Sequence, residues 1–178
     1  MSTASLDDLK NELAGRGLLT APQIEDTFVY GQGRFSATGA DVMVNVDPEV
    51  EERGPFEVDA FADAVRRLLN LTVADWGGIV DAIAGELEAA VGSEPVEEQT
   101  DLRDDLALTS IVVFADATLL SFDAPRQFPD SLIRAQLDPD LAVEDVEVDE
   151  RDDDGTETLT FSSLDALLDH LSAERPES

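Results

Sequence analysis

The stretch SIVVFADATLLSF, residues 110–122, decides the fold of this chain. It holds two runs rich in β-branched, aromatic and leucine residues, 110–115 and 118–122, which a short break at Asp116 separates. Runs of this length and composition are typical of strands, and so short a break joins neighbours in an antiparallel sheet. The stretch therefore predicts two strands of a meander.

The chain after this stretch repeats the pattern. Residues 131–137 and 143–149 predict a third and a fourth strand, with a turn between them that begins at Asp138. In the fourth strand, Val143 and Val146 are out of phase with strict alternation, which predicts a β-bulge there.

The end of the sequence predicts one more strand and one more helix. Residues 158–161 would form the strand, across an acidic turn at 152–155. Ser162 and Asp165 then have capping-box spacing, and the helix that they begin carries the apolar residues Leu164, Leu167, Leu168 and Leu171.

The sequence before the meander also predicts strands. Val42, Val44 and Val46 alternate along the chain, so one face of this strand should be buried. Residues 28–36 predict a tight hairpin with its turn at 31–33, because the two glycines of GQG tolerate the positive φ angles of such turns.

Two helices are predicted between these strands and the meander. Phe61, Val65 and Leu68 recur at helical spacing in the first helix. Thr72 and Asp75 cap the second, whose apolar stripe comprises Trp76, Val80, Ile83 and Leu87. Their short connection favours an antiparallel helix hairpin that packs on the sheet.

A short helix is also predicted near the N-terminus. Ser5 and Asp8 have the spacing of a capping box, and one face of the helix carries Leu6, Leu9 and Leu13. Residues 18–25 look like a connector, so residues 1–25 are predicted to form a helical appendage and residues 26–178 a single domain.

These elements together predict the α+β class. The expected architecture is an antiparallel sheet, built from the N-terminal strands and the C-terminal meander and packed against a helix hairpin. Short helices lie at both ends of the chain, and the polar, acidic stretch 93–105 is predicted as a loop.

Charge is the dominant feature of the composition. The 178 residues include 41 acidic and 11 basic ones, which gives a net charge of −30. Nucleic acid and anionic membrane both attract basic patches, so neither is expected as a partner. The acidity fits adaptation of a whole lineage to salt, or a functional acidic face; the composition favours the first.

The chain has no cysteine, so disulfides, thiolate metal sites and cysteine nucleophiles are excluded. The N-terminal residues have neither the basic region nor the apolar region of a secretory signal, and the cytoplasm is the expected location. His170 is the only histidine, in the predicted last helix, which leaves little material for a catalytic triad. No catalytic residue and no cofactor are predicted.

One segment resembles a calcium-binding loop. Glu150, Asp152 and Asp154 precede Gly155 with the spacing of the first, third and fifth loop positions. Phe161 stands at the twelfth position, where such loops need a glutamate. An acidic hairpin turn is therefore the favoured interpretation, and the three carboxylates are weak metal candidates.

Three residues are candidates for an interaction surface. Trp76 lies on the predicted second helix, and tryptophan is common at binding hot spots, although its spacing also fits the core. Arg66 and Arg67 form the only pair of adjacent basic residues in the chain. We expect a protein partner, while the oligomeric state stays open.

The chain resembles a group of bacterial predicted cytosolic proteins of unknown function, over roughly residues 26–150. The segments that carry the resemblance are DTFVYGQGRF, DVMVNVD, FADAVRRLLNL, SIVVFADATLLSFDA and FPDSLIRAQLDPDLAVEDVEVDE. The resemblance implies an N-terminal strand pair, a helical middle and a C-terminal β-meander, and it implies no activity.

Three classes of function remain open on the sequence. The favoured one is a protein-interaction or accessory module without catalysis, which would use an acidic face or an apolar groove between helices and sheet. The second is a carboxylate or metal-carboxylate enzyme, which the missing catalytic residues disfavour. The third is a nucleic-acid mimic that inhibits a basic protein, which the even spread of acidic residues disfavours.

Overall fold

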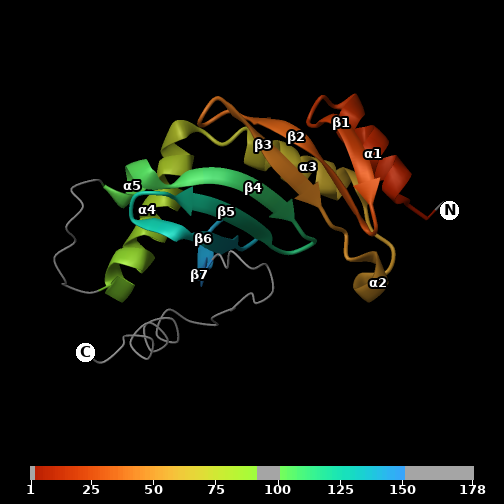
Figure 1. Cartoon of the computed structure of the whole chain (residues 1–178). Helices are drawn as coiled ribbons and strands as arrows, with labels where there is room; N and C mark the ends of the chain where they lie inside the picture. Colours follow the sequence, from red (N-terminus) through yellow and green to blue (C-terminus); the bar gives the residue numbers. More distant parts are fainter. Residues whose placement is uncertain (1–2, 92–100, 151–178) are drawn as a thin grey trace.

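A computed structural model of the chain describes residues 3–91 and 101–150 (Figure 1). Its centre is a seven-stranded sheet in which the strands follow one another in sequence order, β1 to β7. The strands are Thr20–Glu25, Phe28–Phe35, Ala40–Val46, Ala107–Val113, Thr118–Ala124, Phe128–Leu137 and Val143–Glu150. The α+β class is confirmed.

The helices of the described residues are α1 to α5. They span Leu6–Gly15, Val50–Arg53, Val58–Leu69, Val73–Val91 and Leu102–Asp105. No helix among them is long and apolar enough to cross a membrane.

The sheet is antiparallel at every junction except one. β3 pairs with β4 in parallel, with Val44 opposite Ile111. A parallel pair needs a long crossover connection, and here α2 to α5 supply it. The prediction of an antiparallel sheet is therefore wrong at this junction, because the connection carries the chain back across the sheet to the end at which β3 begins.

Helices α3 and α4 lie behind the sheet in Figure 1 and cover one of its faces. The predicted alternation of β3 is confirmed, since Val42, Val44 and Val46 point into the core with exposed fractions of 4% or less. α3 packs on α1, β2 and β4, whereas α4 packs on α5 and β7. The sequence predicted an antiparallel helix pair, but the two helices contact different parts of the fold.

The N-terminal helix is part of the core. Ser5 and Asp8 form the predicted capping box, with the Ser5 amide donating to Asp8 Oδ2 at 2.9 Å. Leu9 and Leu13 are fully buried in the same hydrophobic cluster as the residues of the sheet. The capping pair of α4 is also confirmed, because Thr72 Oγ1 accepts from the Asp75 amide at 3.1 Å.

Two predictions for the N-terminal third are wrong. Thr20–Glu25 is an edge strand and not a connector. Residues 28–35 form one continuous strand and not a hairpin, so the two glycines of GQG serve close packing instead of a turn. A Cβ on Gly31 would meet Pro22 Cα at 3.2 Å, and a Cβ on Gly33 would meet Leu69 Cδ1 at 2.9 Å.

This packing makes Gly33 sensitive to substitution. Gly33→Val should lower the free energy of unfolding by about 1–3 kcal/mol, because the new side chain collides with Leu69 and with the Leu18 carbonyl. Gly78→Ala is the control, since nothing lies within 4 Å of the added Cβ, and it should stabilise α4 by about 0.5–1 kcal/mol. Urea unfolding measures both changes, and an unchanged midpoint for Gly33→Val would contradict the close approach.

The stretch 93–105 contains a short helix that the sequence did not predict. Residues 102–105 form α5, where Leu102 is buried. Asp105 is also buried, and its carboxylate accepts from the amides of Arg126 and Gln127 at 3.0 and 2.9 Å. This side chain therefore fixes the β5–β6 turn.

The meander of four strands is confirmed. The predicted bulge is confirmed as well, because Gln136 lies opposite Asp145 whereas Leu137 lies opposite Val143. The predicted strand at 158–161 and the helix that Ser162 begins lie outside the described residues.

Candidate functional site

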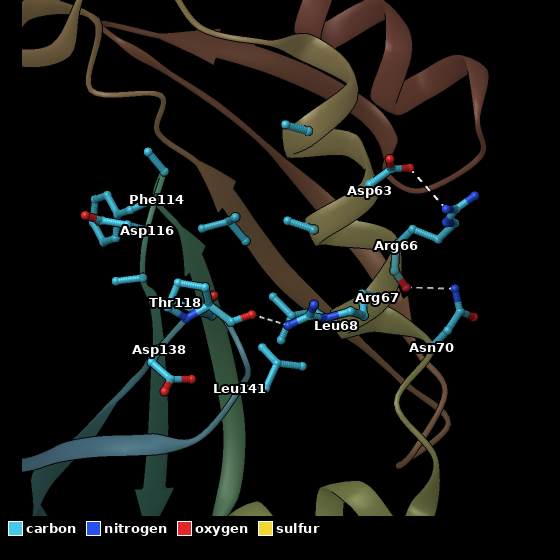
Figure 2. A pocket seen from close by; sticks show the side chains of 16 residues that line it. Asp63, Arg66, Arg67, Leu68, Asn70, Phe114, Asp116, Thr118, Asp138 and Leu141 are labelled. Atoms are coloured by element: carbon cyan, nitrogen blue, oxygen red, sulfur yellow. Dashed lines mark hydrogen bonds and ion pairs between the residues drawn. The ribbon is translucent and has the colours of Figure 1, made fainter.

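Three adjoining cavities follow α3 and the start of α4 on the side that faces the β4–β5 and β6–β7 turns. From the N-terminal end of the helix, their volumes are about 230, 590 and 390 Å³. Ala60, Ala64 and Phe114 line both the first and the second cavity, while Arg67 and Leu141 line both the second and the third. Because the linings are shared, we describe the three cavities together as the α3 groove, and Figure 2 shows the second of them.

The groove is long enough for a short peptide. α3 has 12 residues, so at 1.5 Å per residue it is about 18 Å long. An extended chain rises about 3.3 Å per residue, and the groove therefore matches about five residues of extended peptide.

The wall that α3 contributes combines small apolar side chains with charged ones. Ala60 and Ala64 lie one helical turn apart and face Phe114 across the groove. At the N-terminal end, Phe56 packs edge-on against Phe61 with the ring centroids 5.8 Å apart. Small side chains on the helix keep the groove open, while the aromatic rings offer apolar contact area.

The opposite wall includes the turn between β6 and β7, which a side chain caps. Asp138 Oδ1 accepts from the amides of Asp140 and Ala142, both at 2.9 Å. Leu141 has a φ of 66°, a left-handed conformation that leucine rarely adopts. The side-chain cap holds the turn in this shape, and the shape places Leu141 and Pro139 in the lining of the groove.

Two of the three arginines that line the groove have carboxylate partners. Arg53 Nε lies 2.8 Å from Glu49 Oε2, and its Nη2 lies 2.9 Å from Asp116 Oδ2. Arg66 Nη2 lies 3.1 Å from Asp63 Oδ1. The hydrogen bonds with Asp116 and the charges of Asp116 and Glu49 raise the pKa of Arg53, so it stays charged at any accessible pH.

Arg67 differs from both. Its Nη2 donates a hydrogen bond to the Pro139 carbonyl, and no carboxylate of the described residues forms an ion pair with it. Figure 2 shows the side chain reaching from α3 toward the turn that holds Asp138 and Leu141. Arg67 thus stands between the second and the third cavity.

The structure separates the residues that the sequence proposed for interaction. Arg66 and Arg67 both line the α3 groove. Trp76 lies elsewhere, partly buried against the core, with its ring 4.8 Å from that of Phe35 and stacked 5.8 Å from that of Phe122. Its helical spacing reflects this packing.

The weak metal candidates are only partly placed. The backbone of Glu150 ends β7, whereas Asp152 and Asp154 lie outside the described residues, as does His170. Within residues 3–91 and 101–150, no group of three or more His, Cys, Asp or Glu side chains is positioned to hold a metal ion.

A second charged cluster lies on the other face of the sheet. Asp149 is 3% exposed, and Arg134 Nη1 lies 3.1 Å from its Oδ2. Glu147 is directly opposite Arg134 in the register. Burial, together with the charges of Asp145 and Asp149, raises the pKa of Glu147, while Arg134 opposes the rise.

This cluster predicts a pH effect. A raised pKa means that the folded state holds the proton more tightly than the unfolded state, so ionised Glu147 destabilises the fold as pH rises. Glu147→Gln should therefore raise the melting temperature near neutral pH, and the gain should vanish below about pH 4, where the wild-type residue is protonated.

The matched control is Glu144→Gln, which removes the same charge from an exposed position on the same strand. Thermal unfolding followed by circular dichroism across this pH range measures both variants. Equal gains from the two substitutions would show that net charge alone, and not the environment of Glu147, is responsible.

Most of the groove could not be read from the sequence. Arg66 and Arg67 stood out as a basic pair in an acidic chain, and Asp138-Pro139 stood out as a turn. Nothing in the sequence placed these two features opposite each other. Two alanines one turn apart on an amphipathic helix were the available signal for Ala60 and Ala64.

Comparison with known proteins gives no match: no family model, no curated protein and no solved structure is similar to this chain.

Proposed function

We propose that this protein is a binding module without catalysis, and that its α3 groove takes an extended segment of a partner polypeptide. The observation that carries the proposal is the groove itself. It is long, it has an apolar wall of alanine and phenylalanine side chains, and polar groups are placed at intervals along it. Ligand sites commonly combine apolar lining with a few oriented polar groups.

The shape favours an extended chain over a compact small molecule. The three cavities follow one another along α3 instead of forming one deep chamber. An extended peptide places alternate side chains on the same side, so two or three of them would enter the groove. Pro139, whose carbonyl already accepts from Arg67, and the neighbouring turn would then border the bound segment.

The way the fold uses its carboxylates also supports binding over nucleic-acid mimicry. Arg16 is paired with Glu12, Asp59 and Asp63. Arg103 is likewise surrounded by three carboxylates, those of Asp81, Glu88 and Asp101. These six acidic groups join elements of the fold to one another, and in that role they are not free to imitate the phosphates of a nucleic acid.

The proposal is tested by blocking the groove. Ala60→Trp should fill the space that Ala60 leaves between α3 and Phe114, while Ala82→Trp places the same bulk on an exposed position of α4. The full chain is used to select from two random libraries of nine-residue peptides, one with free and one with blocked C-termini.

Enriched peptides are then synthesised, and their dissociation constants are measured by fluorescence anisotropy. We expect affinity to fall at least about tenfold for Ala60→Trp, since a filled site excludes its ligand, and to stay unchanged for Ala82→Trp. If no peptide is enriched, or if both variants bind as the wild type does, the proposed function is wrong.

A further inference from the structure

Arg67 is unusual among the arginines of an acidic protein. Acidic residues outnumber basic ones by 41 to 11 in the sequence. Six arginines each form an ion pair with at least one carboxylate: Arg16, Arg34, Arg53, Arg66, Arg103 and Arg134. Arg67 forms none with the part of the chain that the structure describes, although it lies next to Arg66 on the same helix.

The position of Arg67 leaves most of its donors available to a ligand. A guanidinium group has five N–H donors, and the hydrogen bond to the Pro139 carbonyl uses one of them. The side chain is exposed, and it lines both the cavity of about 590 Å³ and that of about 390 Å³. A group bound in either cavity therefore lies beside a free edge of the guanidinium.

The hydrogen bond to Pro139 also holds the side chain in place. Asp138 accepts hydrogen bonds from two amides of the β6–β7 turn, so the Pro139 carbonyl that accepts from Arg67 is held in place by the same cap. An arginine that is positioned before its ligand arrives loses less side-chain entropy on binding. The structure thus presents a pre-positioned cation within a groove that is partly apolar.

We infer that Arg67 binds a carboxylate of the peptide segment that occupies the α3 groove; this inference rests on the proposed function. The planar guanidinium matches a carboxylate with two parallel hydrogen bonds. A phosphate would fit the same donors, but it carries about twice the charge at neutral pH. Asp138 and Asp140 stand at the same end of the groove and would repel it more strongly.

The carboxylate has two sources, the C-terminus of the segment or an aspartate or glutamate side chain. The peptides enriched in the library selections distinguish them. Each is synthesised with a free C-terminal acid and with a C-terminal amide, and each acidic side chain is replaced in turn by its amide. The dissociation constants of these peptides are measured against the wild type, Arg67→Gln and Arg67→Lys.

We expect one carboxylate in each peptide to contribute to the affinity for the wild-type protein. Its replacement by an amide should weaken binding to the wild type about tenfold, as expected for loss of a charged hydrogen-bond pair. The same replacement should have no effect on binding to Arg67→Gln. Arg67→Lys keeps the charge but not the two parallel donors, so it should restore only part of the difference.

The outcomes separate the two proposals. If Ala60→Trp abolishes binding but every amide peptide binds as tightly as its acid, the groove is the binding site and the role of Arg67 is refuted. The role is also refuted if replacing the acid by the amide changes the dissociation constant by the same factor for the wild type and for Arg67→Gln. If Ala60→Trp has no effect, or no peptide is enriched, the groove is not the site and the inference about Arg67 falls with it.

Discussion

Phe122→Ala is expected to lower the free energy of unfolding by about 3–5 kcal/mol, one of the two largest losses that we predict for a single substitution. Phe122 is fully buried in β5, and its ring stacks on that of Trp76. Truncation removes this contact and leaves a cavity between α4 and the sheet, which the surrounding side chains fill only in part.

Urea unfolding followed by far-ultraviolet circular dichroism measures the loss. Phe122→Leu is the control, because it keeps most of the apolar volume and should cost less than about 1.5 kcal/mol. The fluorescence of Trp76, the only tryptophan, should shift to longer wavelength in Phe122→Ala. A loss below that of the leucine control would contradict the packing of α4 on β5.

Leu13→Ala should cost about 2–5 kcal/mol, because Leu13 is fully buried and lies in the same hydrophobic cluster as the sheet. The substitution also tests whether α1 unfolds together with the rest of the fold. Trp76 lies on α4, so its fluorescence reports unfolding of a different helix. If α1 is part of one cooperative unit, Leu13→Ala moves the transition seen by Trp76 and that seen by circular dichroism together.

Leu6→Ala is a suitable control for this experiment, since Leu6 lies on the same helix but is only partly buried. It should cost less than Leu13→Ala. A Trp76 transition that stays at its wild-type midpoint in Leu13→Ala would mean that residues 1–25 fold as a separate appendage.

Elements with a buried, regular face could be predicted from the sequence. Val42, Val44 and Val46 alternate because β3 lies in the middle of the sheet with one face on the core. The stripe that includes Ile83 and Leu87 marked α4 for the same reason. In each case burial imposes the periodicity from which the element is recognised.

Elements without a buried, regular face could not be predicted from the sequence. β1 is an edge strand whose residues are nearly all exposed, and Pro22 interrupts its pattern, so it looked like a connector. The glycines of β2 indicated a turn, whereas their role is to let Leu19 and Leu69 approach the strand closely. The purpose of a glycine depends on neighbours that the local sequence does not contain.

The candidate site was harder still, because it is assembled from three distant segments. Arg67 comes from α3, Phe114 from the β4–β5 turn and Leu141 from the β6–β7 turn. Each segment could be predicted as a helix or a turn, yet their arrangement around a groove depends on the crossover that returns the chain from β3 to β4. Local propensity carries no information on that arrangement.

The central claim is that the α3 groove binds an extended segment of a partner polypeptide. The most direct test is a titration of the ¹⁵N-labelled full chain with a nine-residue peptide from the library selections. The amide chemical shifts of the protein are measured by NMR at each peptide concentration. We predict that the largest changes fall on Ala60, Ala64, Phe114 and Leu141, which line the groove. Changes centred instead on the opposite face of the sheet, around Arg134 and Glu147, would contradict the claim.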